Sequence, residues 1–242
     1  MCIRDSTNAT GSATAAFTLT VIAATCANGG TCVIGERGPG GGIIYYVSAT
    51  NFTSTGSTCN TTCKYLEVAP ATWSSSGVIV ADDSIYQWST NMTATTGQDI
   101  TTAGTESLFT DEKFNWKIGQ GFYNTSVMKV SGATSAAQAA VLAYAGSDAS
   151  AGQWFIPSMN ELNELCKYAR GEDTGDPTVA CVLGSGTLKT GTTNDLGGFV
   201  PSLYWSSSEL NVADAWSQFF DSGFQYIDSK DDTIFVRPVR AF

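Results

Sequence analysis

Histidine is absent from this chain of 242 residues. It is the commonest general base and zinc ligand, and the usual group that activates a serine or cysteine nucleophile. Its absence excludes Ser-His and Cys-His catalytic pairs and weakens the case for a zinc site. The serines at 206–208 are therefore interpreted as strand and turn hydroxyls rather than as a nucleophile cluster. Neither a metal nor a cofactor is expected.

Basic residues are also scarce, because 12 Lys and Arg stand against 22 Asp and Glu, a net charge of −10. Nucleic acids and anionic membranes bind clustered positive charge, so neither is an expected partner. Only 14% of the residues are charged while 43% are hydrophobic. A core of this size beneath a surface of Ser, Thr, Asn and Gly is typical of secreted bacterial β-rich proteins. There is no recognisable signal peptide and no apolar run long enough to span a bilayer, so direct membrane insertion is not expected.

Seven cysteines contrast with these absences. Cys2 lies in an opening, residues 1–6, that matches nothing after it and is interpreted as a non-native scar. Proximity favours the disulfides Cys26–Cys32, Cys59–Cys63 and Cys166–Cys181 for the remaining six. A metal site is the alternative, although these spacings without histidine fit zinc badly. Disulfides predict an oxidising compartment and an extracellular or cell-surface protein, in which case the missing signal peptide indicates a truncated N-terminus.

The first residues after this opening predict a strand that does not belong to the main domain. Phe17, Leu19 and Val21 alternate with threonines over the end of residues 7–25. A single strand is not stable alone, so this one is interpreted as the last strand of a truncated immunoglobulin-like module. Its alternative, an N-terminal strand of the main domain, stays open. The predicted division continues with a linker over 26–34 that holds the first disulfide, and a main domain over 35–242.

Strand signals follow at Ile43–Val47 and over 63–70, where Pro70 ends the run. The glycines at 38–42 lack the phosphate-loop pattern and no helix follows them, so they are interpreted as a turn with unusual backbone angles. Residues 71–121 have little periodicity. A loop of this length in a compact domain is expected to be functional.

Two capping boxes predict two helices. Ser135 with Gln138 precedes an alanine-rich run, and Ser158 with Glu161 precedes a run whose apolar residues share one face. After these helices, Leu203–Phe242 reads as short aromatic runs separated by turn residues, which predicts an antiparallel meander whose last strand is central to the fold.

Two arginines in the last run, Arg237 and Arg240, are expected to be structural. An arginine flanked by Val and Phe on a strand should be at least half buried and therefore paired. Glu161 and Glu209 are the expected partners. Replacing either arginine is accordingly predicted to destabilise the fold.

Several segments together carry a resemblance to a family. WFIPSMNEL at 154–162, YWSSSE at 204–209, AW at 215–216 and VRPVRAF at 236–242, with GPGGGIIYYV at 38–47 and CKYLEVAP at 63–70, resemble the Lcl C-terminal domain family, named for a collagen-like bacterial adhesin. The resemblance covers about residues 35–242. It implies an α+β, C-type-lectin-like fold, in which two helices flank a twisted antiparallel sheet and long irregular loops carry the binding surface. Trp154, Trp205 and Trp216 are then expected in the core.

The resemblance implies a non-catalytic, extracellular, adhesin-like module that binds a glycan or a protein surface. Aromatic rings stack on sugars while amides and carboxylates bind hydroxyls. The candidate ligand-binding residues are Trp88, Trp116, Asn211, Asp214, Tyr226 and Asp228. The calcium-binding triplets of C-type lectins are missing, so calcium-bridged sugar binding is unsupported. The acidic net charge favours a neutral or mixed glycan over the sulfated ligands that the adhesin suggests.

Two alternatives remain for the function. One is a structural spacer or protein-binding module of a multidomain surface protein. The other, more remote, is an enzyme of the formylglycine-generating type, which shares the broader fold and requires a pair of reactive cysteine thiols.

Overall fold

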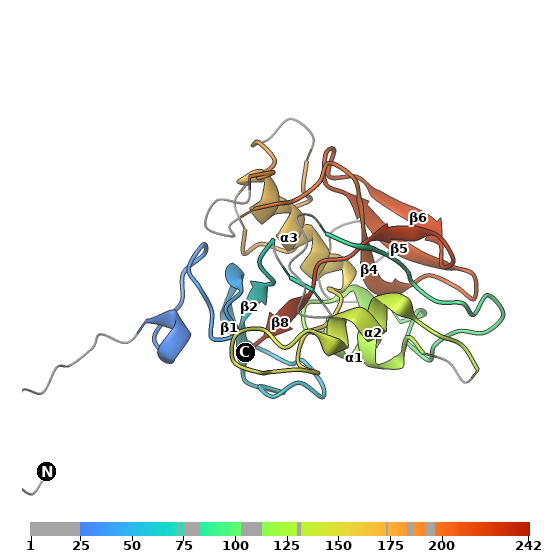
Figure 1. The fold of residues 1–242 in the computed structure, drawn as a ribbon, viewed down its shortest axis with the longest axis horizontal. Helices are drawn as coiled ribbons and strands as arrows, with labels where there is room; N and C mark the ends of the chain where they lie inside the picture. The colour runs from blue at the N-terminus through green and yellow to red at the C-terminus, as the bar shows by residue number, and fades with distance from the viewer. Residues whose placement is uncertain are drawn as a thin grey trace, which may run out of the picture.

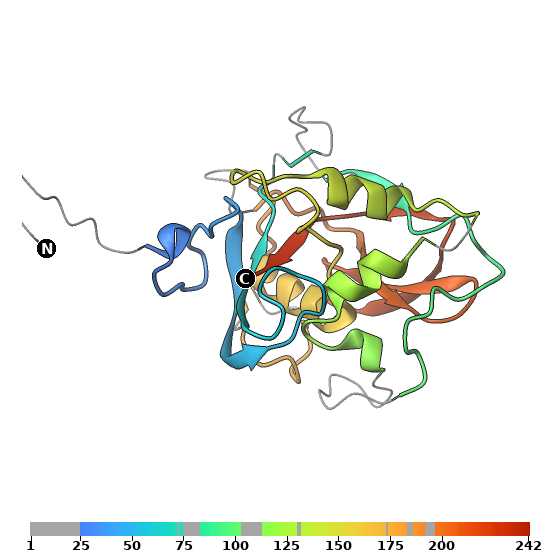
Figure 2. The same cartoon turned by 90° about the horizontal axis from the view of Figure 1, so that it is seen from below.

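The structure is a computed structural model that describes residues 25–71, 73–74, 83–102, 113–129, 132–172, 174–182, 186–191 and 197–242. The scar predicted over 1–6 and nearly all of the immunoglobulin-like strand predicted over 7–25 lie outside these residues. The described chain is α+β, as expected, with two sheets and three α-helices (Figures 1 and 2).

A small antiparallel sheet joins the two predicted early strands to the end of the chain. Its strands are β1 (Ile43–Phe52), β2 (Cys63–Val68) and β8 (Val239–Ala241), in the order β1-β2-β8. The register pairs Val68 with Val239 and Leu66 with Ala241. β8 thus lies beside β2, so the last strand belongs to the small sheet and not to the meander in which it was predicted.

The large sheet contains most of the predicted meander. Its strands are β3 (Ile85–Gln87), β7 (Thr233–Phe235), β4 (Leu203–Glu209), β5 (Asp214–Phe219) and β6 (Gln225–Ser229), in the order β3-β7-β4-β5-β6. The antiparallel neighbours β4, β5 and β6 are confirmed. The prediction is wrong for the last run, because β7 lies on the far side of β4 and forms a parallel bridge there. The run then divides near Pro238, which has no N–H for a sheet ladder, and continues as β8.

Three α-helices complete the described fold, one more than expected: α1 (Gly121–Val127), α2 (Ala136–Ala143) and α3 (Met159–Arg170). In α3 the Ser158 hydroxyl and the Glu161 carboxylate bind each other's backbone amides, as predicted. In α2 only the Ser135 half of the predicted box forms, and the Gln138 side-chain nitrogen donates to the carbonyl of Thr125. No side chain caps the start of α1, which explains why the sequence does not reveal this helix.

The core lies around α3, all of whose residues are buried. This helix contacts β1 of the small sheet as well as β4 and β5 of the large one, and it lies between the two sheets in Figure 1. Trp154 and Trp205 are buried, as expected, while Trp216 is partly buried with its ring 4.8 Å from that of Trp116. Hydrophobic burial on both faces of the helix therefore unites the two sheets.

Both predicted arginines are buried, but their expected partners are wrong. Arg237 forms an ion pair with Asp83, and Arg240 forms ion pairs with Glu67 and Asp148. Glu209 instead pairs with Lys230 at 2.5 Å. The partner Asp83 comes from the irregular stretch after Pro70, where sequence periodicity gives no indication of position.

Glu161 has the capping role that was predicted for it but does not pair with either arginine. Its carboxylate accepts hydrogen bonds from the amides of Gly119 at 2.8 Å and Ser158 at 2.7 Å. It therefore joins the segment before α1 to the start of α3 without an arginine.

The glycine-rich turn at 38–42 is shaped mainly by close packing. Gly40 and Gly42 donate their amides to the carboxylate of Glu67, each at 3.0 Å. A Cβ at Gly40 would lie 2.7 Å from a Trp154 ring carbon, and one at Gly42 would lie 2.5 Å from the Val68 carbonyl oxygen. Only Gly41, with φ of 80°, needs the unusual backbone angle that the sequence suggested for the turn.

Candidate functional site

All three predicted disulfides are present. They join Cys26 to Cys32, Cys59 to Cys63, and Cys166 to Cys181. Every cysteine that the structure describes is therefore paired. The described residues also contain no group of three or more His, Cys, Asp or Glu placed to hold a metal ion. Among the helices of the described chain, none is both long and apolar enough to cross a membrane.

Two of the six candidate ligand-binding residues are core residues. Trp88 is 0% exposed and donates its indole N–H to the carbonyl of Ser206 at 2.8 Å. Trp116 is 3% exposed and packs against Trp216. Neither ring is available to stack on a sugar, so neither residue belongs to a ligand-binding surface. The prediction is wrong for these two residues because residues 71–121 lack periodicity and look like an exposed loop, whereas the fold buries both tryptophans.

The other four candidates lie on β5 and β6 or in the turn before β5, at the β6 edge of the large sheet. Asn211 donates to the Asp214 carboxylate at 2.9 Å and accepts from the Asp214 amide at 3.0 Å, which closes the turn between β4 and β5. On β6, Tyr226 is exposed, while the Asp228 carboxylate accepts a hydrogen bond from Ser217. Most polar atoms of these residues are thus engaged within the chain, and Tyr226 offers the most accessible side chain of the four.

A pocket that the sequence did not predict lies between the linker and the small sheet. Its volume is about 340 Å³, and its lining residues are Cys26, Gly29, Gly30, Pro39, Asn51, Thr62, Lys64, Tyr65 and Phe242. The linker segment lies beside the small sheet in both views of the fold (Figures 1 and 2). Its position follows from packing, since Cys26 and Cys32 are buried against Ile44 with Tyr65 and Phe242 beside them.

The pocket combines an aromatic wall with a polar rim. The rings of Tyr65 and Phe242 lie 5.3 Å apart at 33°. Asn51 and Thr62 are exposed, and Lys64 is the one charged residue among those that line the pocket. β2 positions Lys64 and Tyr65 next to each other, and the amides of both donate to the Phe242 carbonyl. The register between β2 and β8 therefore places Tyr65 beside Phe242. Because these two residues are far apart in the sequence, the sequence alone does not indicate the pocket.

Two buried carboxyl groups have strongly shifted pKa values but belong to the framework. Burial raises the pKa of Glu161 to about 7, although amide hydrogen bonds from Ser158 and Gly119 oppose the shift. Burial likewise raises the pKa of Glu67 to about 7 against the opposing charge of Arg240. Neither residue lines the pocket. A shifted carboxyl is a sign of function only when substrate can reach it, so we assign both to stability.

These shifts predict that the fold loses stability as the pH rises from about 4.5 to about 7. A carboxyl whose pKa is higher in the folded chain favours folding below its unfolded pKa of about 4.5, and this contribution disappears as the pH rises through the folded value. Urea unfolding across this range should show the decline. Glu67→Gln and Glu161→Gln should each flatten it, whereas Glu36→Gln at an exposed position should leave it unchanged. A slope of opposite sign, or one that neither buried variant alters, would contradict the assignment.

Comparison with known proteins agrees with the resemblance from residue 79 onward and does not extend to the segments at 38–47 and 63–70. A family model described as the Lcl C-terminal domain matches residues 79–240. No curated protein matches the chain. The match spans β3 to β8 and all three helices, and β8 connects this region to β1 and β2 through the small sheet. The family and the disulfides indicate an extracellular or surface protein. The chain belongs to the Lcl C-terminal domain family.

Proposed function

We propose that the chain is a non-catalytic, extracellular ligand-binding module of a bacterial surface or secreted protein, and that the pocket beside the small sheet binds a glycan. The observation that carries the proposal is the aromatic wall of Tyr65 and Phe242 beneath a rim of Asn51, Thr62 and Lys64. Sugar rings present apolar C–H faces together with hydroxyl edges. A site for one sugar unit needs this pairing of a flat apolar wall with a few polar groups.

The charges favour a neutral or mixed glycan. Lys64 can bind one carboxylate or several hydroxyls, but the pocket has no second basic residue among those that line it. The net charge of −10 repels densely sulfated chains. Calcium is not part of the proposal, because the described residues offer no cluster that could hold it.

A glycan array probed with the native chain, with and without calcium, tests the proposal. We expect binding to a neutral or singly acidic glycan that does not change when calcium is removed. The Lys64→Ala variant should lose this signal, while Lys129→Ala, which removes an exposed lysine that does not line the pocket, should keep it. Silence across neutral and acidic glycans would instead favour a spacer or a protein-binding module.

The enzyme alternative depends on free thiols. Chemistry of the formylglycine-generating type needs two reactive cysteines, and the six cysteines that the structure describes form disulfides. Alkylation of the native chain followed by mass spectrometry should therefore label at most Cys2. Two labelled thiols of low pKa would restore the enzyme as a candidate.

A further inference from the structure

Among the strands that the structure describes, β6 is an edge strand of the large sheet. No described strand other than β5 pairs with it. Phe219 donates its amide to the Phe224 carbonyl, and Lys230 donates its amide to the Ala213 carbonyl. Because hydrogen-bonded and non-bonded pairs alternate in an antiparallel ladder, the N–H and C=O groups of Gln225 and Ile227 point away from β5. These groups form a short template for an additional strand.

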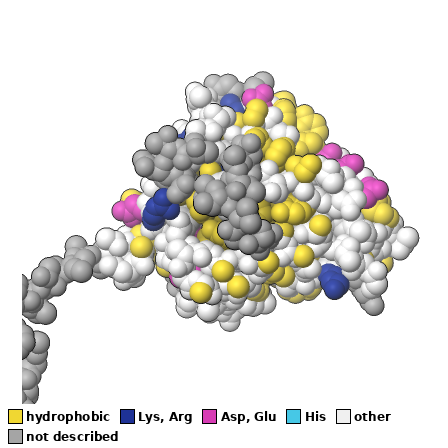
Figure 3. Space-filling model, in the orientation of Figure 1, with side chains coloured by type: hydrophobic (Ala, Val, Ile, Leu, Met, Phe, Trp, Pro, Cys, Tyr) yellow, Lys and Arg dark blue, Asp and Glu magenta, His cyan; other side chains and the backbone are white. Residues whose placement is uncertain are grey.

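The side chains of this edge are unusually apolar for an exposed strand. Phe224, Tyr226 and Ile227 are 58%, 44% and 52% exposed. Figure 3 shows hydrophobic side chains gathered over the part of the molecule where Figure 1 places β5 and β6, with acidic side chains beside them. Natural edge strands usually carry charged residues, proline or a bulge that prevents pairing. β6 contains no proline, and its pairing with β5 contains no bulge. Asp228 is the one charged residue within the strand.

The exposed charged residues on β6 and in the turns at its ends are all acidic. Asp221, Asp228, Asp231 and Asp232 lie on β6 or in the turns at its two ends, and Asp221, Asp231 and Asp232 are exposed. Lys230 is the single basic residue between Phe219 and Thr233, and it is buried in its ion pair with Glu209. The strand therefore presents apolar rings and free backbone groups between acidic ends.

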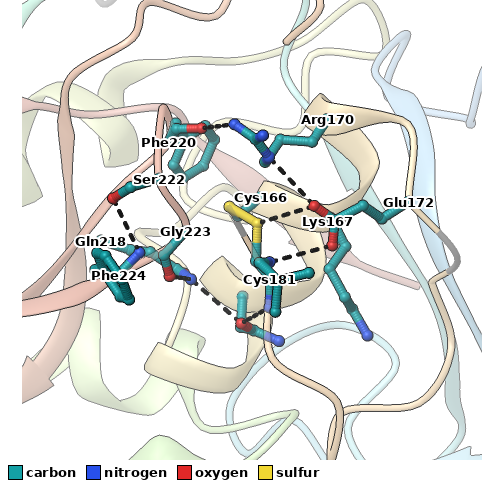
Figure 4. The surroundings of a disulfide bond; sticks show 12 residues. Cys166, Lys167, Arg170, Glu172, Cys181, Gln218, Phe220, Ser222, Gly223 and Phe224 are labelled. Carbon is teal, nitrogen blue, oxygen red and sulfur yellow. Dashed lines mark hydrogen bonds and ion pairs between the residues drawn. A yellow bond between two sulfur atoms is a disulfide. The ribbon is translucent and has the colours of Figure 1, made fainter. Parts of the chain in front are cut away.

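The turn that precedes β6 is also fixed by contacts with neighbouring segments. Figure 4 shows Arg170 and Gln218 on either side of the disulfide Cys166–Cys181, each directed at the turn that precedes β6. Arg170 donates to the Phe220 carbonyl at 3.0 Å, and Gln218 donates to the Gly223 carbonyl at 2.9 Å. A Cβ at Gly223 would lie 2.2 Å from the Cys181 carbonyl oxygen, so the turn packs directly on the loop that the disulfide holds. A strand fixed in advance loses little conformational entropy when a partner binds.

We propose that β6 binds an extended segment of a partner protein, rich in Lys or Arg alternating with apolar residues, as an additional strand of the large sheet. Backbone hydrogen bonds to Gln225 and Ile227 supply affinity, and the acidic ends of the strand select a basic segment. A second copy of this chain is a poor occupant, because two β6 edges would place like acidic residues together.

A fluorescent peptide of about eight residues, alternating lysine with valine and thus long enough for one strand, is a suitable probe. The comparison peptide alternates glutamate with valine. The native chain should bind only the basic peptide, and binding should weaken as salt is added. The key variant is Ile227→Pro, since proline is tolerated at an edge whose N–H faces solvent but removes the donor that the peptide needs. Its matched control is Ile227→Thr, which keeps that N–H.

We expect Ile227→Pro to weaken binding of the basic peptide by about tenfold or more while its melting temperature stays near that of Ile227→Thr. Asp221→Asn combined with Asp231→Asn should weaken binding and reduce its salt dependence. Equal binding of the two peptides, no binding of either, or unchanged binding to Ile227→Pro would overturn the proposal. Dimerisation of the native chain that Ile227→Pro abolishes would also overturn it, because the occupant would then be a second copy. Lys64→Ala should not affect peptide binding, so this result is independent of the glycan proposal.

Discussion

Replacing Arg237 with alanine is expected to lower the free energy of unfolding by about 3–5 kcal/mol, the range for removing one partner of a buried ion pair. Arg237 is 2% exposed and pairs with Asp83. The Asp83 carboxylate also accepts hydrogen bonds from Trp73 and Tyr204. Without the guanidinium, a buried carboxylate would lose its counter-charge, and this penalty exceeds the loss of the contacts alone.

The same guanidinium joins the end of the chain to two segments that are far apart in the sequence. It donates to the carbonyls of Ala69 at 3.1 Å and Gly198 at 2.9 Å, and it lies 4.5 Å from the centre of the Phe199 ring. The peptide carbonyls would also be left without these donors.

Urea unfolding followed by tryptophan fluorescence measures the effect of Arg237→Ala. Arg37→Ala, which removes an exposed arginine, is the control and should cost at most about 1 kcal/mol. A loss of ligand binding by Arg237→Ala at unchanged stability would contradict the structural role.

Removing the disulfide Cys166–Cys181 should have the next largest effect, about 3 kcal/mol. Cross-linking restricts the unfolded chain, and the model of loop closure gives roughly this value for a loop of 15 residues. Cys166 is also buried in the core, and the backbone of Cys181 packs directly against Gly223 in the turn before β6. The variant should replace both cysteines with alanine so that no thiol or hydroxyl is buried.

The disulfide Cys59–Cys63 provides the matched control, because Cys63 is equally buried but the sequence separation is only 4. Loop closure predicts that its removal costs less, by about 1 kcal/mol. Thermal unfolding of the two double-alanine variants makes the comparison. An equal or larger loss for the shorter loop would contradict an explanation based on the unfolded chain.

Local signals in the sequence predicted the local parts of the fold. Capping residues located α2 and α3, apolar and aromatic runs bounded by turn residues or proline located β1, β2 and the strands β4 to β6, and proximity identified the disulfides. Each of these features depends on residues close to one another in the sequence, at most 15 positions apart. The helix α1 has no such signal, since Gln120 provides no side-chain cap.

Features that depend on distant segments were not predictable in the same way. The burial of Arg237 follows from its apolar neighbours, but its partner Asp83 is 154 positions away. Trp88 and Trp116 look like loop residues because only the tertiary fold turns them inward. The pocket is hidden for the same reason, since its wall forms where β8 places Phe242 beside Tyr65.

The most direct test of the account is a glycan array that compares the native chain with Lys64→Ala and Ile227→Pro under identical conditions. We expect a glycan that binds the native chain and Ile227→Pro equally well but does not bind Lys64→Ala, with all three chains folded. This result would locate glycan binding in the pocket beside the small sheet and separate it from the β6 edge. Loss of glycan binding in Ile227→Pro with full binding in Lys64→Ala would show that the glycan does not bind in this pocket.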